Sequence, residues 1–245
     1  MLKNITLYVV EDYNALSQKA ALLFAQTVKT NPTGVYGLAT GSTPEGMYDR
    51  LVKMSQTNEI DMTKIVAFNL DEYVSIGPDH TQSYAYYMAT KLFNATGVPI
   101  QNRNIPRGDA PDPHNECAEY EKKIVNAGGI HLQVLGIGTN GHIGFNEPAD
   151  TFAGQTSYAA LAEETIQANS RFFDSIDDVP KFAISMGIQT IMMAETILLL
   201  ASGESKAKIL GEALQGPITP QVPASALQLH RNVIVIADKA AAKFL

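Results

Sequence analysis

Apolar residues gather in short runs along the chain, and the runs alternate with longer stretches in which apolar positions recur at helical spacing. The runs are rich in Val, Ile and Leu and predict strands at residues 5–10, 34–39, 64–70, 131–137, 182–186, 197–201 and 232–237. The periodic stretches predict helices at residues 13–30, 44–54, 83–93, 115–127, 189–194 and 206–214, with a last helix after the final strand. Strands and helices therefore alternate over the whole chain.

The strand runs show little alternation between apolar and polar positions. Continuous apolar runs are typical of strands that are buried on both faces of a parallel sheet. Together with the alternating order of elements, they predict a three-layer α/β/α fold with a doubly wound, mostly parallel sheet, formed as a single domain by residues 1–245. Such sheets bind ligands at the carboxyl ends of their strands, so the segments that follow strands carry the candidate chemistry.

Composition excludes several classes of partner. The chain has 245 residues, 18 Lys and Arg against 25 Asp and Glu, and a net charge of −7. An acidic chain without a basic run is not expected to bind nucleic acid or an anionic membrane. The single cysteine, Cys117, excludes an intramolecular disulfide and a multi-cysteine metal site. The beginning of the chain lacks the features of a signal peptide, and no window approaches 18 apolar residues, so we expect a cytoplasmic protein.

The first candidate loop is Leu38-Ala-Thr-Gly-Ser-Thr-Pro-Glu-Gly46, which links a strand to a helix. Pro44 suits the first position of that helix, and Ser42 or Thr43 can serve as its cap. Because free N–H groups at a helix N-terminus bind anions, the loop is a candidate phosphate site. An ordinary capped turn remains the alternative, since caps of this composition are common.

The second candidate segment is Phe68-Asn-Leu-Asp-Glu-Tyr73, at the end of a buried strand. Asp71 is a candidate general base there. The alternative is that Asp71 only caps a helix, because acidic residues are frequent at strand ends and only a perturbed pKa would favour catalysis.

The third segment is Leu135-Gly-Ile-Gly-Thr-Asn-Gly-His-Ile-Gly-Phe-Asn-Glu-Pro148. Its first glycines match the dinucleotide-binding pattern, but Gly144 and Pro148 prevent the required helix, and no strand is expected between residue 150 and residue 163. We therefore expect no nucleotide cofactor. The preferred interpretation is a glycine-rich loop that lets a substrate approach the backbone, with His142 and Glu147 as a titratable pair suited to proton transfer.

Two basic residues follow other elements near the same end of the sheet. Arg171 lies in a long polar segment, residues 148–180, which we expect to form a lid. Lys206 stands where a helix begins after a strand. Either side chain can hold a phosphate, and either can equally be a solvated surface charge.

Five segments in order resemble the glucosamine-6-phosphate deaminase family. They are the three candidate segments together with Ala168-Asn-Ser-Arg-Phe-Phe173 and Ser202-Gly-Glu-Ser-Lys-Ala207. The resemblance implies conversion of glucosamine 6-phosphate and water to fructose 6-phosphate and ammonia, without a metal or cofactor. It implies that Asp71 moves the proton from C2 to C1, that His142 opens the sugar ring, and that Glu147 orients this histidine. The substrate phosphate would be held by Gly41, Ser42, Thr43, Arg171 and Lys206.

The chain departs from this family pattern at several positions. Asn140 stands where some members have Asp, so the catalytic group of Asn140, His142 and Glu147 has one carboxylate rather than two. Ser157 and Ala159 stand where allosteric members have a basic pair, and the chain ends at Leu245 without a longer extension. We therefore expect no activation by N-acetylglucosamine 6-phosphate, and a monomer rather than a hexamer.

Three other functions remain open on the sequence: a 6-phosphogluconolactonase-like enzyme, a pentose-phosphate isomerase, and a non-catalytic sugar-phosphate sensor. The segments Asp71-Glu-Tyr73 and Asn146-Glu-Pro148 disfavour the first two, and the presence of both Asp71 and His142 disfavours the sensor.

Overall fold

A parallel sheet of seven strands forms the centre of the molecule. The computed structural model describes residues 4–245, and its strands lie side by side in the order β1-β10-β9-β6-β2-β3-β5, with every neighbouring pair parallel. Their bounds are β1 (Ile5–Val10), β10 (Val233–Asp238), β9 (Thr196–Ala201), β6 (Leu132–Gly136), β2 (Val35–Leu38), β3 (Val66–Asn69) and β5 (Arg103–Asn104). The fold class predicted from the hydrophobic pattern is confirmed.

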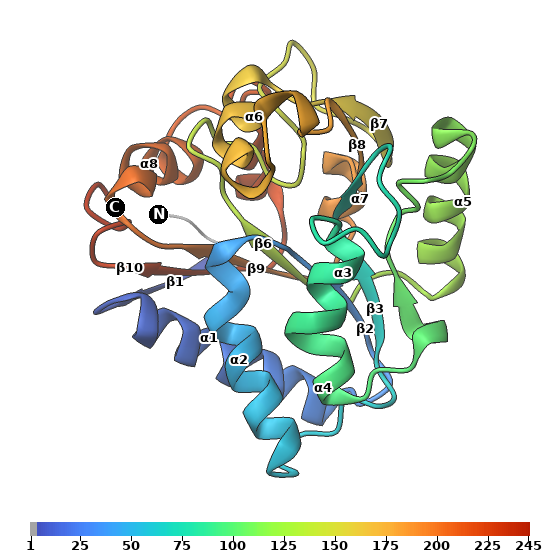
Figure 1. The fold of residues 1–245 in the computed structure, drawn as a ribbon. Helices are drawn as coiled ribbons and strands as arrows, with labels where there is room; N and C mark the ends of the chain where they lie inside the picture. The colour runs from blue at the N-terminus through green and yellow to red at the C-terminus, as the bar shows by residue number, and fades with distance from the viewer. Residues whose placement is uncertain (1–3) are drawn as a thin grey trace.

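Helices cover both faces of this sheet (Figure 1). One face carries α1 (Tyr13–Thr30), α2 (Ser42–Gln56), and α3 (Tyr84–Met88), which continues through the π-helical turn Ala89–Phe93 into α4 (Asn94–Thr96). The other face carries α5 (Pro113–Asn126), α7 (Ile188–Met192) and α8 (Ala207–Gln215). This distribution follows from right-handed crossovers between parallel strands, because the chain moves outward from β1 to β5 and then returns.

Helix α1 shows how local pattern and packing agree. Asp12 caps the helix by accepting a hydrogen bond of 2.8 Å from the Ala15 N–H group, which satisfies one of the free donors of the first turn. Leu16, Ala20 and Phe24 follow one another at a spacing of four residues and are fully buried against the sheet. The Phe24 ring lies 5.1 Å from the ring of Tyr36 on β2. Burial of such a side chain stabilises the fold by about 1.5–3 kcal/mol.

A second, antiparallel sheet stands at the carboxyl end of β3. It has the order β4-β8-β7, formed by β4 (Asp71–Tyr73), β8 (Phe182–Ser185) and β7 (Ser157–Ala160). The expectation of no strand between residues 150 and 163 is therefore wrong. The sequence Ser-Tyr-Ala-Ala of β7 has no Val or Ile and is only partly buried, so its conformation is set by pairing with β8 rather than by its own composition.

The expected last helix is also absent from the described residues. The chain after β10 forms turns: Ala241 N–H donates to the Asp238 carboxylate, and Ala242 N–H donates to the Asp238 carbonyl.

The order of the strands places a topological switch point between β2 and β6. From β2 the chain proceeds to β3 and β5 on one side, whereas from β6 it proceeds to β9 and β10 on the other. The connections that leave β2 and β6 therefore diverge and open a crevice at the carboxyl ends of these strands. The candidate phosphate loop follows β2, and the glycine-rich loop with His142 follows β6.

Candidate active site

The loop after β2 leaves donors free at the start of α2. Gly41 is the N-cap residue and has a φ of 94°, a conformation that a residue with a Cβ adopts only with strain. Neither Ser42 nor Thr43 acts as the cap, in contrast to the expectation, because the helix begins at Ser42 without a side-chain cap hydrogen bond. Within residues 4–245, the N–H groups of Ser42 and Thr43 have no protein acceptor. These donors are therefore available to an anion.

Two tyrosine side chains hold this loop in place. The Tyr87 hydroxyl donates to the Gly41 carbonyl at 2.8 Å, and the Tyr13 hydroxyl donates to the Ser42 carbonyl at 2.9 Å. The carbonyl groups are thus turned toward the protein. Because the N–H groups of a helix point in the opposite direction to its carbonyl groups, the start of α2 presents donors at the crevice.

Asp71 is a buried carboxyl group next to the same crevice. It is 6% exposed, and no protein donor in the described part of the chain bonds its carboxylate. Burial, with a smaller contribution from the neighbouring Glu72 carboxylate, raises the pKa of Asp71 to about 8. A carboxyl group with such a pKa is suited to accept a proton near neutral pH.

Glu72, rather than Asp71, binds the start of the following helix, whose N-cap residue is Ser83. Its carboxylate accepts hydrogen bonds of 2.9 Å each from the N–H groups of Tyr73, Tyr84 and Ala85, the last two at the start of α3. Burial raises the pKa of Glu72 to about 7, and these three donors act in the opposite direction. The sequence left open that Asp71 only caps a helix. The residue that binds the helix start is the neighbouring Glu72, and no N–H group of α3 bonds the Asp71 carboxylate.

His142 and Glu147 face each other across the glycine-rich loop. His142 Nδ1 lies 2.7 Å from Asn140 Oδ1 and 3.2 Å from Glu147 Oε2, while Asn140 Nδ2 donates to Glu147 Oε2 at 2.7 Å. Because Nδ1 faces two oxygen acceptors, it carries the proton in the neutral ring, and Nε2 is the free proton acceptor. The three residues expected to act together are therefore in direct contact.

Gly138 provides the space for the His142 ring. A Cβ atom at Gly138 would lie 2.2 Å from Cε1 of the ring. Gly138, one of the glycines that match the dinucleotide-binding pattern, is therefore needed here to leave space for the His142 ring.

Glu147 remains ionised although it is largely buried. Burial opposes the charge, but hydrogen bonds from His142, Thr165 and Asn140 and the charge of His142 lower the pKa of Glu147 to about 2. Thr165 was not anticipated, because it lies 18 residues further along the chain; its hydroxyl donates to Glu147 Oε1.

The glycine-rich loop packs directly against Asp71. A Cβ atom at Gly144 would lie 3.5 Å from Asp71 Oδ2 and 3.0 Å from Ser185 Oγ. Ser185 is paired with Asp71 between β8 and β4, and its Oγ accepts a hydrogen bond of 2.9 Å from the Phe145 N–H group. Asn146 further ties the loop to β8, since its Nδ2 donates to the Ile143 and Met186 carbonyl oxygens. Asp71 therefore lies directly against the His142 loop.

The two candidate cations differ in their surroundings. Lys206 is the N-cap residue of α8 and is half-buried. Burial lowers the pKa of its ammonium group. No carboxylate of residues 4–245 lies within ion-pair distance of Lys206. Arg171 lies on the exposed 3-10 turn Ser170–Phe172, with its guanidinium 4.6 Å from the centre of the Phe172 ring. The structure brings Arg171 into no hydrogen bond with the Gly41 loop within the described chain.

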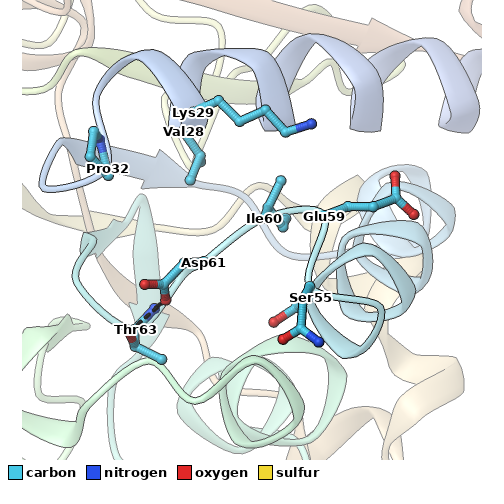
Figure 2. A pocket seen from close by; sticks show the side chains of 9 residues that line it. Val28, Lys29, Pro32, Ser55, Glu59, Ile60, Asp61 and Thr63 are labelled. Carbon is cyan, nitrogen blue, oxygen red and sulfur yellow. Dashed lines mark hydrogen bonds between the residues drawn. The ribbon is translucent and has the colours of Figure 1, made fainter.

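A cleft of about 440 Å³ lies elsewhere, between the ends of α1 and α2 (Figure 2). Its lining includes Pro32 and Thr63, which precede β2 and β3, so it opens at the amino ends of the strands. Asp61 in this cleft already accepts hydrogen bonds from the N–H group and the hydroxyl of Thr63. The cleft has neither the position nor the free groups of the site at the opposite edge.

Within the described chain, no group of three or more His, Cys, Asp and Glu side chains is arranged to hold a metal ion. None of the helices in this part of the chain combines the length and apolar character needed to cross a bilayer.

The sequence matches the family described as glucosamine-6-phosphate isomerases/6-phosphogluconolactonase over residues 11–236. It is 48% identical over 239 residues to a glucosamine-6-phosphate deaminase of Clostridium perfringens strain 13, covering 98% of this chain and 99% of that protein. A glucosamine-6-phosphate deaminase of Alkaliphilus oremlandii is 51% identical over the same shares of both chains.

Two solved structures superimpose on nearly the whole chain. A protein described as a monomeric glucosamine-6-phosphate deaminase superimposes with a TM-score of 0.94 at 44% identity, over 99% of this chain and 100% of that one. A 6-phosphogluconolactonase from Trypanosoma cruzi superimposes with a TM-score of 0.81 at 19% identity, over 100% of this chain and 98% of that one. The second likeness concerns the fold alone.

Proposed function

Since this chain belongs to the family of glucosamine-6-phosphate isomerases and 6-phosphogluconolactonases, we propose that it converts glucosamine 6-phosphate and water to fructose 6-phosphate and ammonia. One observation supports this chemistry most directly. The buried Asp71 carboxylate, which has no donor among residues 4–245, lies against the loop that carries the His142–Glu147 pair. One bound sugar could therefore contact both groups: Asp71 as the base for a carbon-bound proton, and His142 as the acid–base group for a sugar oxygen.

In the first step, His142 opens the pyranose ring. Its Nδ1 is held by Asn140 and Glu147, which leaves Nε2 as the group that exchanges a proton with the sugar. Proton transfer between the ring oxygen and the C1 hydroxyl releases the open-chain aldose. The ionised Glu147 carboxylate stabilises the imidazolium form during this transfer.

In the second step, ionised Asp71 removes the C2 proton and returns it to C1 while a proton passes from the amino nitrogen to O1, so that the amino aldose becomes a C2 imine with a C1 hydroxyl. Water then adds to C2 and ammonia leaves, which gives the ketose. The burial that raises the pKa of Asp71 to about 8 makes its carboxylate a stronger base than an exposed one. The adjacent Glu72 is also buried, but its carboxylate is already bonded by three backbone N–H groups.

The phosphate group is proposed to bind at the start of α2. The free N–H groups and hydroxyls of Ser42 and Thr43, next to Gly41, supply neutral donors, and Lys206 supplies an unpaired positive charge. Arg171 completes the cationic clamp in this proposal: it lies within segment 148–180, on the turn after α6, and movement of this turn as a lid would bring its exposed guanidinium inward.

The remaining expectations follow from this assignment. We propose that the protein acts as a monomer in the cytoplasm, in the breakdown of amino sugars such as N-acetylglucosamine. The monomeric solved relative supports the first point. Ser157 and Ala159, which lie on β7, provide no basic pair for an activating phosphate.

The test is a coupled assay of ammonia release by the purified protein with glucosamine 6-phosphate, without added metal or nucleotide. We expect turnover, and a loss of turnover in Asp71→Asn with retained ligand binding. Full turnover by that variant would contradict the role of Asp71. Acid release from 6-phosphogluconolactone without ammonia release from glucosamine 6-phosphate would favour the lactonase alternative, because opening of a lactone needs no base for a carbon-bound proton.

A further inference from the structure

Helix α6 (Glu163–Asn169) makes two polar contacts with the site, and both come from one face of the helix. The Thr165 hydroxyl donates to Glu147 Oε1, and Asn169 Nδ2 donates to the Tyr73 hydroxyl at 2.8 Å. Residues 165 and 169 are four apart and therefore neighbours on a helix surface. Glu147 belongs to the His142 loop, whereas Tyr73 is two residues beyond Asp71 on β4. One helix thus contacts both halves of the site.

Thr165 supplies the support that the His142 loop lacks. Oε2 of Glu147 is held from within the loop, by Asn140 and His142. In the described chain, Oε1 is held by Thr165 alone, and the threonine side chain is buried, with 7% of the residue exposed. Two donors on different oxygens fix the plane of the carboxylate, whereas donors on one oxygen leave it free to rotate.

Apolar packing keeps α6 in this position. Tyr73, Phe145 and Leu161 form a small buried cluster, separate from the main core, against which Ile166 and Phe173 pack. Phe145 belongs to the His142 loop, and Leu161 and Phe173 flank α6. The cluster therefore joins α6, the loop and β4 into one unit.

We propose that Thr165 is a positioning residue for the reaction: through Glu147 it orients His142, and it couples the placement of α6 to the catalytic loop. This inference rests on the proposed function only for its kinetic consequences. The contact between α6 and the carboxylate can be measured without substrate. Arg171 follows α6 directly, so the same contact also sets the start of the segment that carries this cation.

The first experiment compares Thr165→Val with Thr165→Ser in steady-state deamination. Valine removes the hydroxyl while keeping a similar shape, so we expect kcat to fall about tenfold with KM unchanged within about twofold, and serine to restore most of the loss. The matched control is Thr190→Val. Thr190 is also buried, with 3% of the residue exposed. Its hydroxyl donates to a carboxylate as well, Glu121 Oε1 at 2.6 Å, which keeps another donor in Thr156.

The control separates positioning from folding. Thr190→Val should lower the melting temperature about as much as Thr165→Val but leave kcat unchanged. An equal loss of kcat in both valine variants, or unchanged kcat in Thr165→Val, would overturn the proposal. If Thr165→Val does not fold, Thr165→Ala provides the same comparison.

The second experiment measures hydrogen exchange of the α6 amides in the substrate-free protein. Glu147→Gln should accelerate exchange in residues 163–169 severalfold, as Thr165→Val does, and the double variant should exchange no faster than either single variant. Additive effects would refute the coupling. If the wild-type protein fails to deaminate glucosamine 6-phosphate, the proposed function fails, but this exchange experiment still decides whether α6 is held by the carboxylate.

Discussion

Gly138→Ala is expected to disable the site without unfolding the protein. The added Cβ would lie 2.2 Å from Cε1 of the His142 ring and 2.4 Å from each ring nitrogen, whereas ordinary contact begins at 3.4 Å. The ring must therefore move by up to 3.4 − 2.2 = 1.2 Å. Such a displacement separates Nδ1 from Asn140 Oδ1 and Glu147 Oε2, which now lie at 2.7 and 3.2 Å.

A misplacement of about 1 Å at a reacting group costs roughly 100-fold in rate, which corresponds to about 2.7 kcal/mol in activation free energy. We expect kcat to fall by this factor. Stability should change little, because the His142 side chain is 24% exposed and can swing toward solvent. Gly138 also lacks a positive φ, so alanine introduces no backbone strain at this position.

The assay is coupled ammonia release, with thermal unfolding measured on the same samples. The matched control is Gly136→Ala, two residues earlier, where an added Cβ meets no atom within 4 Å and φ is also not positive. This control should keep kcat within about threefold of wild type. Retention of more than about a third of the wild-type kcat by Gly138→Ala, or equal losses in both variants, would refute the argument that the glycine makes room for the ring.

Further predictions concern charge and the anion site. Because burial raises the pKa of Asp71 to about 8, kcat/KM should fall as pH decreases below about 8, where the base is protonated; a flat profile between pH 6 and 8 would contradict this. Asp71→Asn should lower kcat by about 10²–10⁴ yet raise the melting temperature. Above about pH 3.8 the unfolded chain releases the Asp71 proton, whereas the folded wild type keeps it up to about pH 8. The stability of the wild type therefore falls as pH rises toward 8. The difference in melting temperature between Asp71→Asn and the wild type should widen from pH 5 to pH 8. Lys206→Met should raise KM about tenfold or more with kcat changed by less than about threefold, as measured by steady-state kinetics; an unchanged KM would remove Lys206 from the phosphate site. N-acetylglucosamine 6-phosphate should leave the kinetics hyperbolic, and sigmoidal curves relieved by this compound would contradict the expectation drawn from Ser157 and Ala159.

Most elements, and the edge of the sheet at which the candidate site lies, can be predicted from the amino-acid sequence alone. Runs of Val, Ile and Leu predicted the strands, and β2, β6, β9 and β10 are largely buried as expected. The run that forms β1 lies at the edge of the sheet and keeps Leu7 and Val9 exposed. The loops at residues 41–43 and 138–147 then had to lie at the carboxyl edge of the sheet. That they are neighbours depends on the strand order, which places β2 beside β6. The pairing of His142 with Glu147 was also accessible, since both lie in one short glycine-rich loop.

Packing between elements determines which of the two buried acids keeps a free carboxylate and which residue supports the His142 loop. Asp71 and Glu72 are adjacent and similar in sequence, but their side chains point to opposite faces of β4, and the start of α3 satisfies only Glu72. β7 owes its conformation to pairing with β8, and Thr165 reaches Glu147 through the folding of α6 onto an aromatic cluster. Such contacts join residues whose separation along the chain carries no periodic signal, so the physical cause lies in packing between elements and not in any local pattern.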